Sequence, residues 1–445
     1  MAASLPNGAA AAAAAADAPL VLAHPDDDEQ VRTWTHTHPS WGPSYPLDVY
    51  LARERQLLTV PLARDGGISQ WILTTEAPPP QAPASQQSNN NNNTSDVEGG
   101  GHDQASRDSP TSQDNKPRRP VLSSCETLRK RALVRAPGPG PQPVREVYAH
   151  GVASVFTYPE FRRRGYAARM LDLLGRRLAA DEAREPGDAA FSVLFSDIGK
   201  TFYAALGWKP FESSHLSFPV DLSAAAAAPE RRDDGAVTTT TPITDENLPA
   251  LVALDEKLLR ARMAADDDTG SGSGSGSTKT RVAILPDMEH MQWHFAREAF
   301  MSTHHLGRAP AVHGAVCVAD PSSSSSSRVW AVWVRVHSGG TADPAKNVVY
   351  IQRLVVEDPA VADADLSRAL RAVLDAARSE AREWMCSRVD MWNPDKRTRR
   401  LIDGMEGLEA KYVVREEDSI TSLRWFGPGS ADDVEWVANE RYEWC

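Results

Sequence analysis

A short glycine-containing turn carries the clearest chemical signal in the sequence. Arg162-Arg163-Arg164-Gly165-Tyr166-Ala167 lies between a predicted strand and a predicted helix and has the form R-x-x-G-x-A. Glycine allows a positive φ and a close approach of the backbone to a ligand, and the free N–H groups at a helix start bind anions. The turn therefore predicts a pyrophosphate site. For these six residues taken alone, a solvated arginine-rich face is the alternative.

The residues around the turn extend the pattern in both directions. Upstream, V-x-T-x-P-E-x-R is formed by Val155, Thr157, Pro159, Glu160 and Arg162. Downstream, F-Y-x-x-L-G-W is formed by Phe202, Tyr203, Leu206, Gly207 and Trp208. The first stretch resembles motif A of the GNAT acetyltransferase superfamily, whose turn binds the pyrophosphate of acetyl-CoA, and residues 194–211 resemble motif B. Ala167 replaces a glycine of the pattern, and Ser196 stands where many members have Asn.

The resemblance implies a role for each matched residue. The backbone of Val155 and Thr157 is expected to pair with the pantetheine arm, with the Val155 N–H placed to polarise the acetyl carbonyl. Ser196 is assigned a further contact to that arm. Tyr203 is expected to protonate the departing thiolate, with a core aromatic as the alternative. The pyrophosphate is expected to be held by Arg163, Arg164, Gly165, Tyr166, Ala167 and Ala168, with Arg162 structural at the turn.

The family reaction implies a proton acceptor but no covalent enzyme intermediate, because the amine attacks the thioester directly. Glu146 and His150 are the candidate bases, since they share a face of the predicted strand 145–158 if that strand is regular up to His150. A bulge, which is usual in the family, changes this parity. An ordinary structural role is the alternative for both residues.

The overall layout resembles the fungal lysine N-acetyltransferases, which acetylate the side-chain amine of free L-lysine in lysine catabolism. This resemblance implies L-lysine as acceptor and acetyl-CoA as acetyl donor, without a metal. Trp34, Trp41 and Tyr50 are candidate walls of the acceptor pocket, although such aromatic residues also form cores. A protein or histone lysine acetyltransferase and a non-catalytic CoA-binding module remain the alternatives.

The periodic segments predict a mixed α/β fold, and the resemblance makes residues 20–220 a GNAT catalytic domain with a central mixed sheet. The expected helices are 26–41, 46–58, 167–182 and a short one through Phe202 and Leu206, and the expected strands are 67–75, 121–134, 145–158 and 191–196.

Residues 240–445 repeat this order and are expected to form a second, degenerate GNAT-like α/β domain. The expected elements are a helix over 244–263, a hairpin of 311–320 with 329–338, a strand over 347–358, a helix within 365–389 and a strand near 389–392. No R-x-x-G-x-A turn follows the strand, so we expect this half to bind no CoA and to complete the acceptor site. Arg353 and Arg388 are candidates to hold a substrate carboxylate, with a locally paired arginine as the alternative.

Composition narrows the remaining function classes. The Ala-rich residues 1–19 and the Pro-, Gln-, Asn-, Ser- and Gly-rich insertion 77–119 are expected to be disordered. A formal net charge of −12 over 445 residues disfavours nucleic-acid and membrane-surface binding. The absence of a long apolar run disfavours a membrane span, and four cysteines without a CxxC pair indicate neither a disulfide framework nor a zinc site. We expect a cytoplasmic protein, and the oligomeric state stays open.

Overall fold

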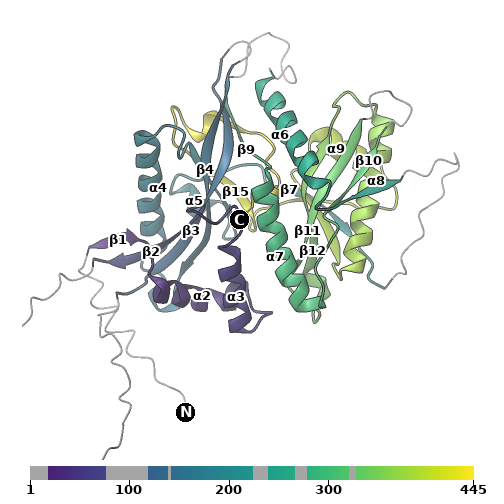
Figure 1. Ribbon diagram of the computed structural model, residues 1–445. Helices are drawn as coiled ribbons and strands as arrows, with labels where there is room; N and C mark the ends of the chain where they lie inside the picture. Colours follow the sequence, from purple (N-terminus) through teal and green to yellow (C-terminus); the bar gives the residue numbers. More distant parts are fainter. Residues whose placement is uncertain are drawn as a thin grey trace, which may run out of the picture.

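Two mixed β-sheets stand side by side with helices between them and on both outer faces (Figure 1). The computed structural model describes residues 19–76, 119–138, 142–223, 239–265, 278–319 and 327–444. The expected disordered segments 1–19 and 77–119 lie outside this part of the chain, except for Pro19 and Arg119. The expected mixed α/β class is confirmed.

The first sheet carries the predicted GNAT strands. Its path is β1 (Leu20–Ala23), β2 (Ile68–Thr75), β3 (Ser123–Arg135), β4 (Val144–Thr157), β5 (Phe191–Ser196), β15 (Ile420–Trp425) and β6 (Lys209–Pro210). Neighbouring strands are antiparallel, except that β4 and β5 are parallel. The far half of β3 also pairs with β9 (Thr280–Ile284), which in turn pairs with β16 (Val434–Trp436). Strands from late in the chain thus complete this sheet.

Strand β4 is irregular at the position where it leaves β5. The two strands pair only from Ala149 to Gly151, and β4 then continues to Thr157 without β5 beside it. Just beyond this point Ser154 has a φ of 53°, and the register between β3 and β4 shifts so that Ser154 and Val155 together oppose Cys125. This is a β-bulge, which bends a strand and re-aims its side chains.

Four helices belong to the first sheet. They are α2 (Asp27–Trp41), α3 (Leu47–Leu57), α4 (Tyr166–Arg184) and α5 (Thr201–Ala204). Helix α2 begins at a capping box, in which Asp26 accepts from the Glu29 N–H and Glu29 accepts from the Asp26 N–H. Helix α4 packs on the sheet through the apolar stripe that its sequence predicts, which includes Met170 and Leu174.

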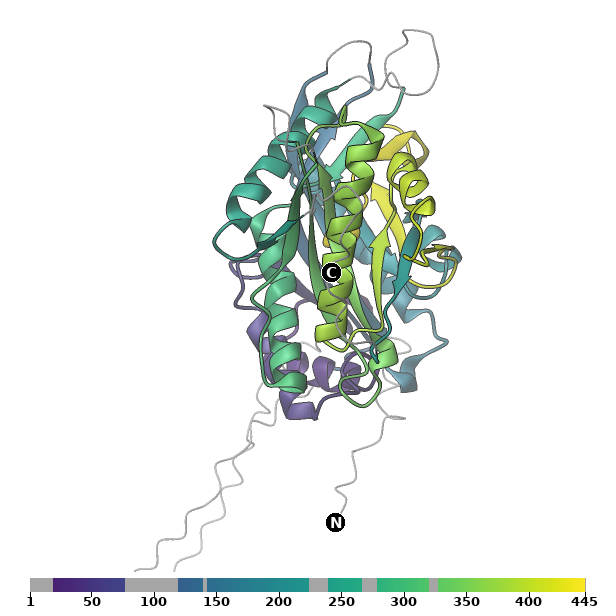
Figure 2. The ribbon, with the colours of Figure 1, turned by 90° about the vertical axis from the view of Figure 1, so that its right-hand side faces the viewer.

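The second sheet includes one strand from the first half of the chain. Its order is β14 (Lys411–Val414), β7 (Ser214–Pro219), β13 (Arg388–Trp392), β12 (Asn347–Val356), β11 (Arg328–His337), β10 (Gly314–Val318) and β8 (Thr240–Ile243). Helices α8 (Asp363–Glu383) and α9 (Lys396–Asp403) cover its outer face (Figure 2). The predicted hairpin is present as β10 and β11.

A middle layer joins the two sheets. Helices α6 (Leu248–Ala264) and α7 (Met288–Leu306) lie between them (Figure 1). Strand β11 is apolar on both faces because Trp330 and Val332 pack toward this layer, whereas Val329 and Trp333 pack toward α8. The resulting core is continuous from β3 to β11, so the halves pack as one body. The expected domain boundary at 220–240 remains a prediction, and strand pairing crosses it.

Candidate active site

The R-x-x-G-x-A turn has the backbone conformation that its sequence predicts. Gly165 has a φ of 77° and is the N-cap of α4, and Arg163 also has a positive φ, of 63°. No side chain caps this helix start, so the N–H groups of its first turn have no side-chain acceptor there. Arg162 donates from Nε to the Thr157 carbonyl at 3.0 Å and ties the turn to the end of β4.

Ser196 and Tyr203 lie on the far side of the opening between β4 and β5. The Ser196 hydroxyl donates to the Gly199 carbonyl at 2.7 Å and accepts from the Ile198 N–H at 3.2 Å, so it braces its own loop. Tyr203 is 9% exposed, and its hydroxyl makes no hydrogen bond to any residue that the structure describes. Burial, with the nearby charge of Asp197, raises the pKa of Tyr203 and keeps the phenol protonated.

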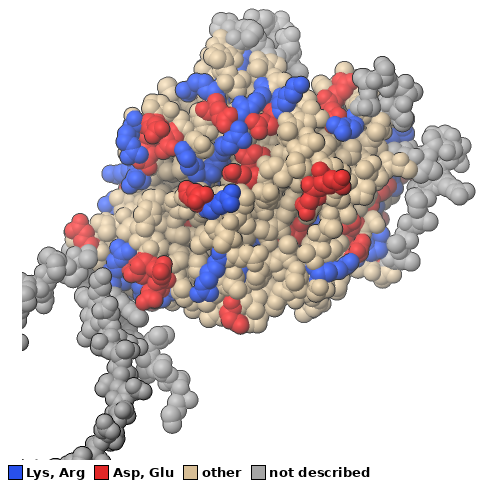
Figure 3. Space-filling view, in the orientation of Figure 1, with Lys and Arg blue, Asp and Glu red and all other residues tan. Residues whose placement is uncertain are grey.

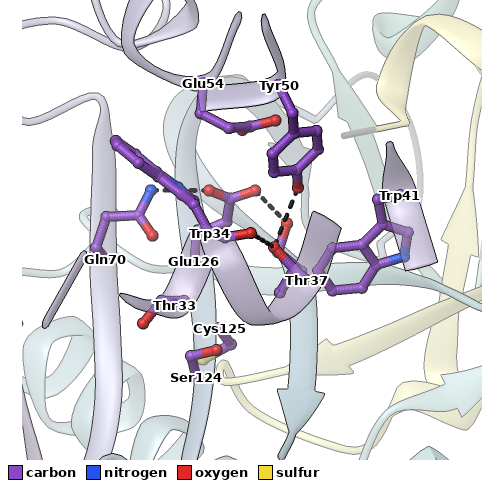
Figure 4. Close-up of a pocket in the computed structure, with 11 residues that line it drawn as sticks. Thr33, Trp34, Thr37, Trp41, Tyr50, Glu54, Gln70, Ser124, Cys125 and Glu126 are labelled. Carbon is purple, nitrogen blue, oxygen red and sulfur yellow. Dashed lines mark hydrogen bonds between the residues drawn. The ribbon is translucent and has the colours of Figure 1, made fainter. Parts of the chain in front are cut away.

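A small pocket opens beside the bulge of β4 (Figure 4). Helices α2 and α3 form one wall, and strands β2, β3 and β4 form the other. The lining residues are Thr33, Trp34, Thr37, Trp41, Tyr50, Glu54, Gln70, Ser124, Cys125, Glu126 and Ser154. The structure thus brings Trp34, Trp41 and Tyr50 together around one cavity. The Thr37 and Tyr50 hydroxyls are hydrogen-bonded at 3.0 Å and fix the ring of Tyr50 in the wall.

Glu126 places a carboxylate at the bulge itself. Its Oε1 accepts from the Ser154 hydroxyl at 2.5 Å, and its Oε2 accepts from Gln70 Nε2 at 2.8 Å. The side chain keeps some exposure to the pocket, but protein atoms surround it. Burial raises the pKa of Glu126, and the neighbouring Glu54 carboxylate raises it further, against the two hydrogen bonds. A carboxyl with a raised pKa, in contact with a cavity, is suited to accept a proton near neutral pH.

Glu54 approaches the same cavity from α3 (Figure 4). Arg53 donates to its Oε1 from Nη2 at 2.5 Å and from Nε at 3.1 Å, so the carboxylate is held in place from behind. Two carboxylates within aromatic walls make the pocket suitable for a cationic amine.

The two predicted bases lie elsewhere. The bulge follows His150, so Glu146 and His150 do share a face of β4, but neither lines the pocket. Glu146 forms ion pairs with Arg131 and Arg260, and the hydrogen bond from Arg131 lowers its pKa. His150 Nε2 lies 3.1 Å from the Asp188 carbonyl, and burial lowers its pKa. Neither residue is placed to take a proton from a group in the pocket.

The two arginines considered for a substrate carboxylate have partners of their own. Arg353 is held by Asp255, at 2.8 Å, and by Glu440. Arg388 pairs with Asp390 at 3.1 Å. Both arginines therefore form ion pairs within the protein, which was the alternative to holding a substrate carboxylate.

Sequence reasoning missed Glu126, Gln70 and Ser154. The available signal was a glutamate within the predicted strand 121–134, since a charge inside a sheet is costly unless it is used or paired. Its relation to Ser154 depends on the bulge, whose position the sequence does not reveal.

A family model described as the LYC1 GNAT-like C-terminal domain matches residues 217–445, just over half of the chain. The chain belongs to this LYC1-like GNAT family. It is therefore an N-acetyltransferase with a second GNAT-like domain in its C-terminal half. The match begins inside β7, the strand that pairs in the second sheet.

Solved structures with a similar fold include three that also cover most of this LYC1-like GNAT chain. A protein from Enterococcus faecalis V583, described as a probable N-acyltransferase, is 11% identical, with 92% of this chain and 73% of that chain covered and a TM-score of 0.46. A GCN5-related N-acetyltransferase from Kribbella flavida is 12% identical, with 92% and 71% covered and a TM-score of 0.45. Eis1 from Mycobacterium abscessus is 13% identical, with 92% and 74% covered and a TM-score of 0.40. No curated protein matches the chain.

GNAT enzymes use acetyl-CoA, and the turn before α4 suits its pyrophosphate. A Cβ placed on Gly165 would meet no protein atom within 4 Å, so the glycine faces open space in which a ligand can approach the backbone. The N–H groups at the start of α4 are uncapped, and the three arginines that precede Gly165 in the chain are exposed. In the part of the chain that the structure describes, no cluster of metal-ligating side chains and no helix long and apolar enough to cross a membrane is found.

The charged side chains of this LYC1-like GNAT protein are distributed without a single-sign patch on one face. Figure 3 shows Lys and Arg interspersed with Asp and Glu over the face seen in Figure 1. This face therefore offers no broad acidic or basic surface, and the carboxylates that line the pocket are those of Glu54 and Glu126.

Proposed function

We propose that this enzyme transfers the acetyl group of acetyl-CoA to the side-chain amine of free L-lysine. The observation that carries the proposal is the Glu126 carboxylate, which stands inside an aromatic pocket at the bulge where β4 leaves β5. Acetyl-CoA supplies the acetyl group as an activated thioester. The turn at Arg163–Ala168 and the free edge of β4 at Val155 and Thr157 hold it, and Ser196 braces the loop beside them.

Glu126 accepts the proton of the acceptor ammonium in this proposal. An amine is a nucleophile only after it loses a proton, and the raised pKa of Glu126 brings this carboxylate closer to neutral pH. Ser154 and Gln70 hold the carboxylate in position. Cys125 follows Ser124 on the same wall, but burial raises the pKa of its thiol, so it stays uncharged and takes no nucleophilic part.

The pocket favours a small free amine over a peptide. Helices α2 and α3 cover one side of it with Trp34, Thr37 and Tyr50, which supports a small acceptor. A histone or other protein substrate would need a channel for the peptide backbone on both sides of the lysine. A non-catalytic CoA-binding module would have no use for the raised pKa of a carboxyl in contact with the cavity.

We expect Tyr203→Phe to lower kcat by about ten- to a thousand-fold, with little change in acetyl-CoA affinity, because a proton donor used in the transition state is lost. The substitution removes a hydroxyl without a described hydrogen-bond partner, so the melting temperature should not fall. Steady-state kinetics together with calorimetry of CoA binding measure both effects. A parental kcat and pH profile in Tyr203→Phe would assign the residue to the core.

The acceptor is tested by a panel of lysine, cadaverine, polyamines and a histone-tail peptide. We expect kcat/KM to fall at least about a hundred-fold from lysine to cadaverine, because a site built for a carboxylate and an ammonium leaves buried polar groups unpaired when they are missing. Equal turnover of lysine and cadaverine, or a preference for the peptide, would reject lysine as the acceptor and leave the acetyltransferase activity standing.

A further inference from the structure

Helix α7, from the second half of the chain, reaches the wall of the acceptor pocket. Its Met301 packs in one apolar cluster with Trp34, Tyr45 and Tyr50. Arg297 lies one helical turn before Met301 and therefore on the same face of α7, which contacts α3. The second GNAT-like half thus presents an arginine beside residues that line the pocket.

Arg53 of α3 is a buried cation with unused hydrogen-bonding capacity. Its side chain is 5% exposed and lies over the Tyr50 ring, with 4.6 Å from Cζ to the ring centroid. Nε and Nη2 donate to Glu54, whereas Nη1 is buried and has no hydrogen-bond partner in the structure. An unsatisfied buried donor is costly, and more so on a charged group, so this atom is expected to gain a partner in the working enzyme.

Arg297 is a second cation, on helix α7, which contacts α3. It makes no hydrogen bond or ion pair to any residue within the described ranges, and its guanidinium lies 5.4 Å from the centroid of the Trp444 ring. Burial lowers the pKa of Arg297 to about 10, and the charge of nearby Arg53 contributes to this shift. Two neighbouring guanidinium groups repel each other, and an anion between them would relieve both and satisfy Nη1 of Arg53.

We propose that Arg53 and Arg297 bind the α-carboxylate of the acceptor amino acid, and that Glu54 faces its α-ammonium. This inference rests on the proposed function and names the substrate class as an α-amino acid with an amine at the end of its side chain. Tyr50 and Glu54 line the α3 end of the cavity, and Arg53 contacts both of them from behind, although neither arginine lines the cavity itself. Glu126 lies on the strand side of the cavity. The acceptor chain then runs along Trp34 and Tyr50 toward Glu126.

The test uses the full-length enzyme, because strands from both halves complete both sheets. Arg297→Met removes the charge and keeps an unbranched side chain against Trp444. We expect the KM for lysine to rise at least about thirty-fold, since one partner of a desolvated charge pair is lost, while kcat/KM for cadaverine changes less than about three-fold. Lysinamide should behave as cadaverine does, and 6-aminohexanoate, which keeps the carboxylate, should lose activity as lysine does.

Arg308→Met is the matched control, because Arg308 also lies over an indole ring, that of Trp384, at 4.1 Å, and it pairs with Glu383 away from the pocket. Its lysine kinetics should stay parental. Arg297→Lys keeps the charge and should recover part of the lysine affinity, which separates a charge effect from a folding defect.

The outcomes distinguish this inference from the function on which it rests. If Arg297→Met keeps the parental ratio of lysine to lysinamide turnover, the carboxylate site is wrong and lysine acetylation stands. If the unmodified enzyme turns over cadaverine or a peptide but not lysine, the proposed acceptor itself is rejected, and the carboxylate site with it.

Discussion

Glu126→Gln is expected to lower kcat by at least about a hundred-fold with little effect on acetyl-CoA affinity, because a positioned general base contributes about 10²- to 10⁴-fold. Glutamine keeps the shape of the side chain but accepts no proton. Its oxygen can still accept from Gln70 Nε2, and its nitrogen can donate to the Ser154 hydroxyl, which reverses that hydrogen bond. Glu146→Gln on β4 is the comparison, because Glu146 lies outside the pocket, in ion pairs with Arg131 and Arg260. If kcat falls in Glu146→Gln but stays at the parental value in Glu126→Gln, the base is Glu146 on β4 and not Glu126.

The pH profile gives a second readout for Glu126. Because its pKa is raised in the folded enzyme, the base is protonated at pH values where an ordinary glutamate is already ionised. We expect the acid limb of kcat/KM to lie above the ordinary glutamate range in the parent and to vanish in Glu126→Gln.

Stability should change in the opposite direction to activity. A raised carboxyl pKa means that the fold favours the protonated form, so this contribution to stability is present below the ordinary pKa and is lost as pH rises through the folded pKa. At pH values above the ordinary glutamate range the raised pKa therefore lowers the stability of the parent. Glu126→Gln removes that penalty, and its melting temperature at neutral pH should equal or exceed that of the parent.

Gly165→Val is expected to weaken acetyl-CoA binding by about a hundred-fold or more, because at least two hydrogen bonds to a charged group are lost and each contributes about 1.5–3 kcal/mol. The added Cβ meets no protein atom within 4 Å, so the new side chain occupies the space in front of the turn and not the core. Isothermal titration calorimetry with CoA measures the effect.

The strain of a β-branched residue at positive φ needs its own control. Gly407 has a φ of 75°, and a Cβ there also meets nothing within 4 Å, so Gly407→Val carries the same backbone penalty away from the turn. The melting temperature should fall by a similar amount in both variants, and the affinity for CoA should fall only in Gly165→Val. Parental CoA affinity in a folded Gly165→Val protein would move the cofactor away from this turn.

Local patterns predicted the elements that bury one clear face. The strand expected at 191–196 is β5, with the same bounds. The helix expected at 167–182 is α4, and its ends differ from the prediction by less than one helical turn. Trp34, Trp41 and Tyr50, proposed as walls of the acceptor pocket, line one cavity, and the binding of the acceptor there stays a prediction. The helix and strand predictions were confirmed because spacing within a short segment determines which side chains share a face.

Elements that depend on distant partners were not predictable in the same way. Helix α7 and strand β9 were not anticipated, because the buried face of α7 includes His290, His294 and Glu298, which interrupt its apolar pattern. Polar residues can be buried when groups far away in the chain form hydrogen bonds with them. His294, for example, is hydrogen-bonded to the Tyr442 carbonyl. Strand β15 is a short segment whose place beside β5 is set by long-range pairing.

The carboxylate that faces the pocket was not predicted, for a similar reason, and the base itself stays a prediction. Glu146 and His150 were chosen by alternation along β4, but the bulge at Ser154 makes the neighbouring strand, and not β4, present a carboxylate to the cavity. Only the pairing register of β3 against β4 reveals this, and that register is not a local property.

Each sheet contains strands from both halves of the chain, and this affects how the protein folds during synthesis. Strand β5 receives its neighbour β15 only after the ribosome has synthesised the entire second sheet between them. Until then the nascent first sheet has an open hydrogen-bonding edge at β5, and such edges recruit other chains. A chain cut short by a premature stop codon before β15 leaves that edge permanently open, so it is a substrate for chaperones and proteases and not a smaller acetyltransferase.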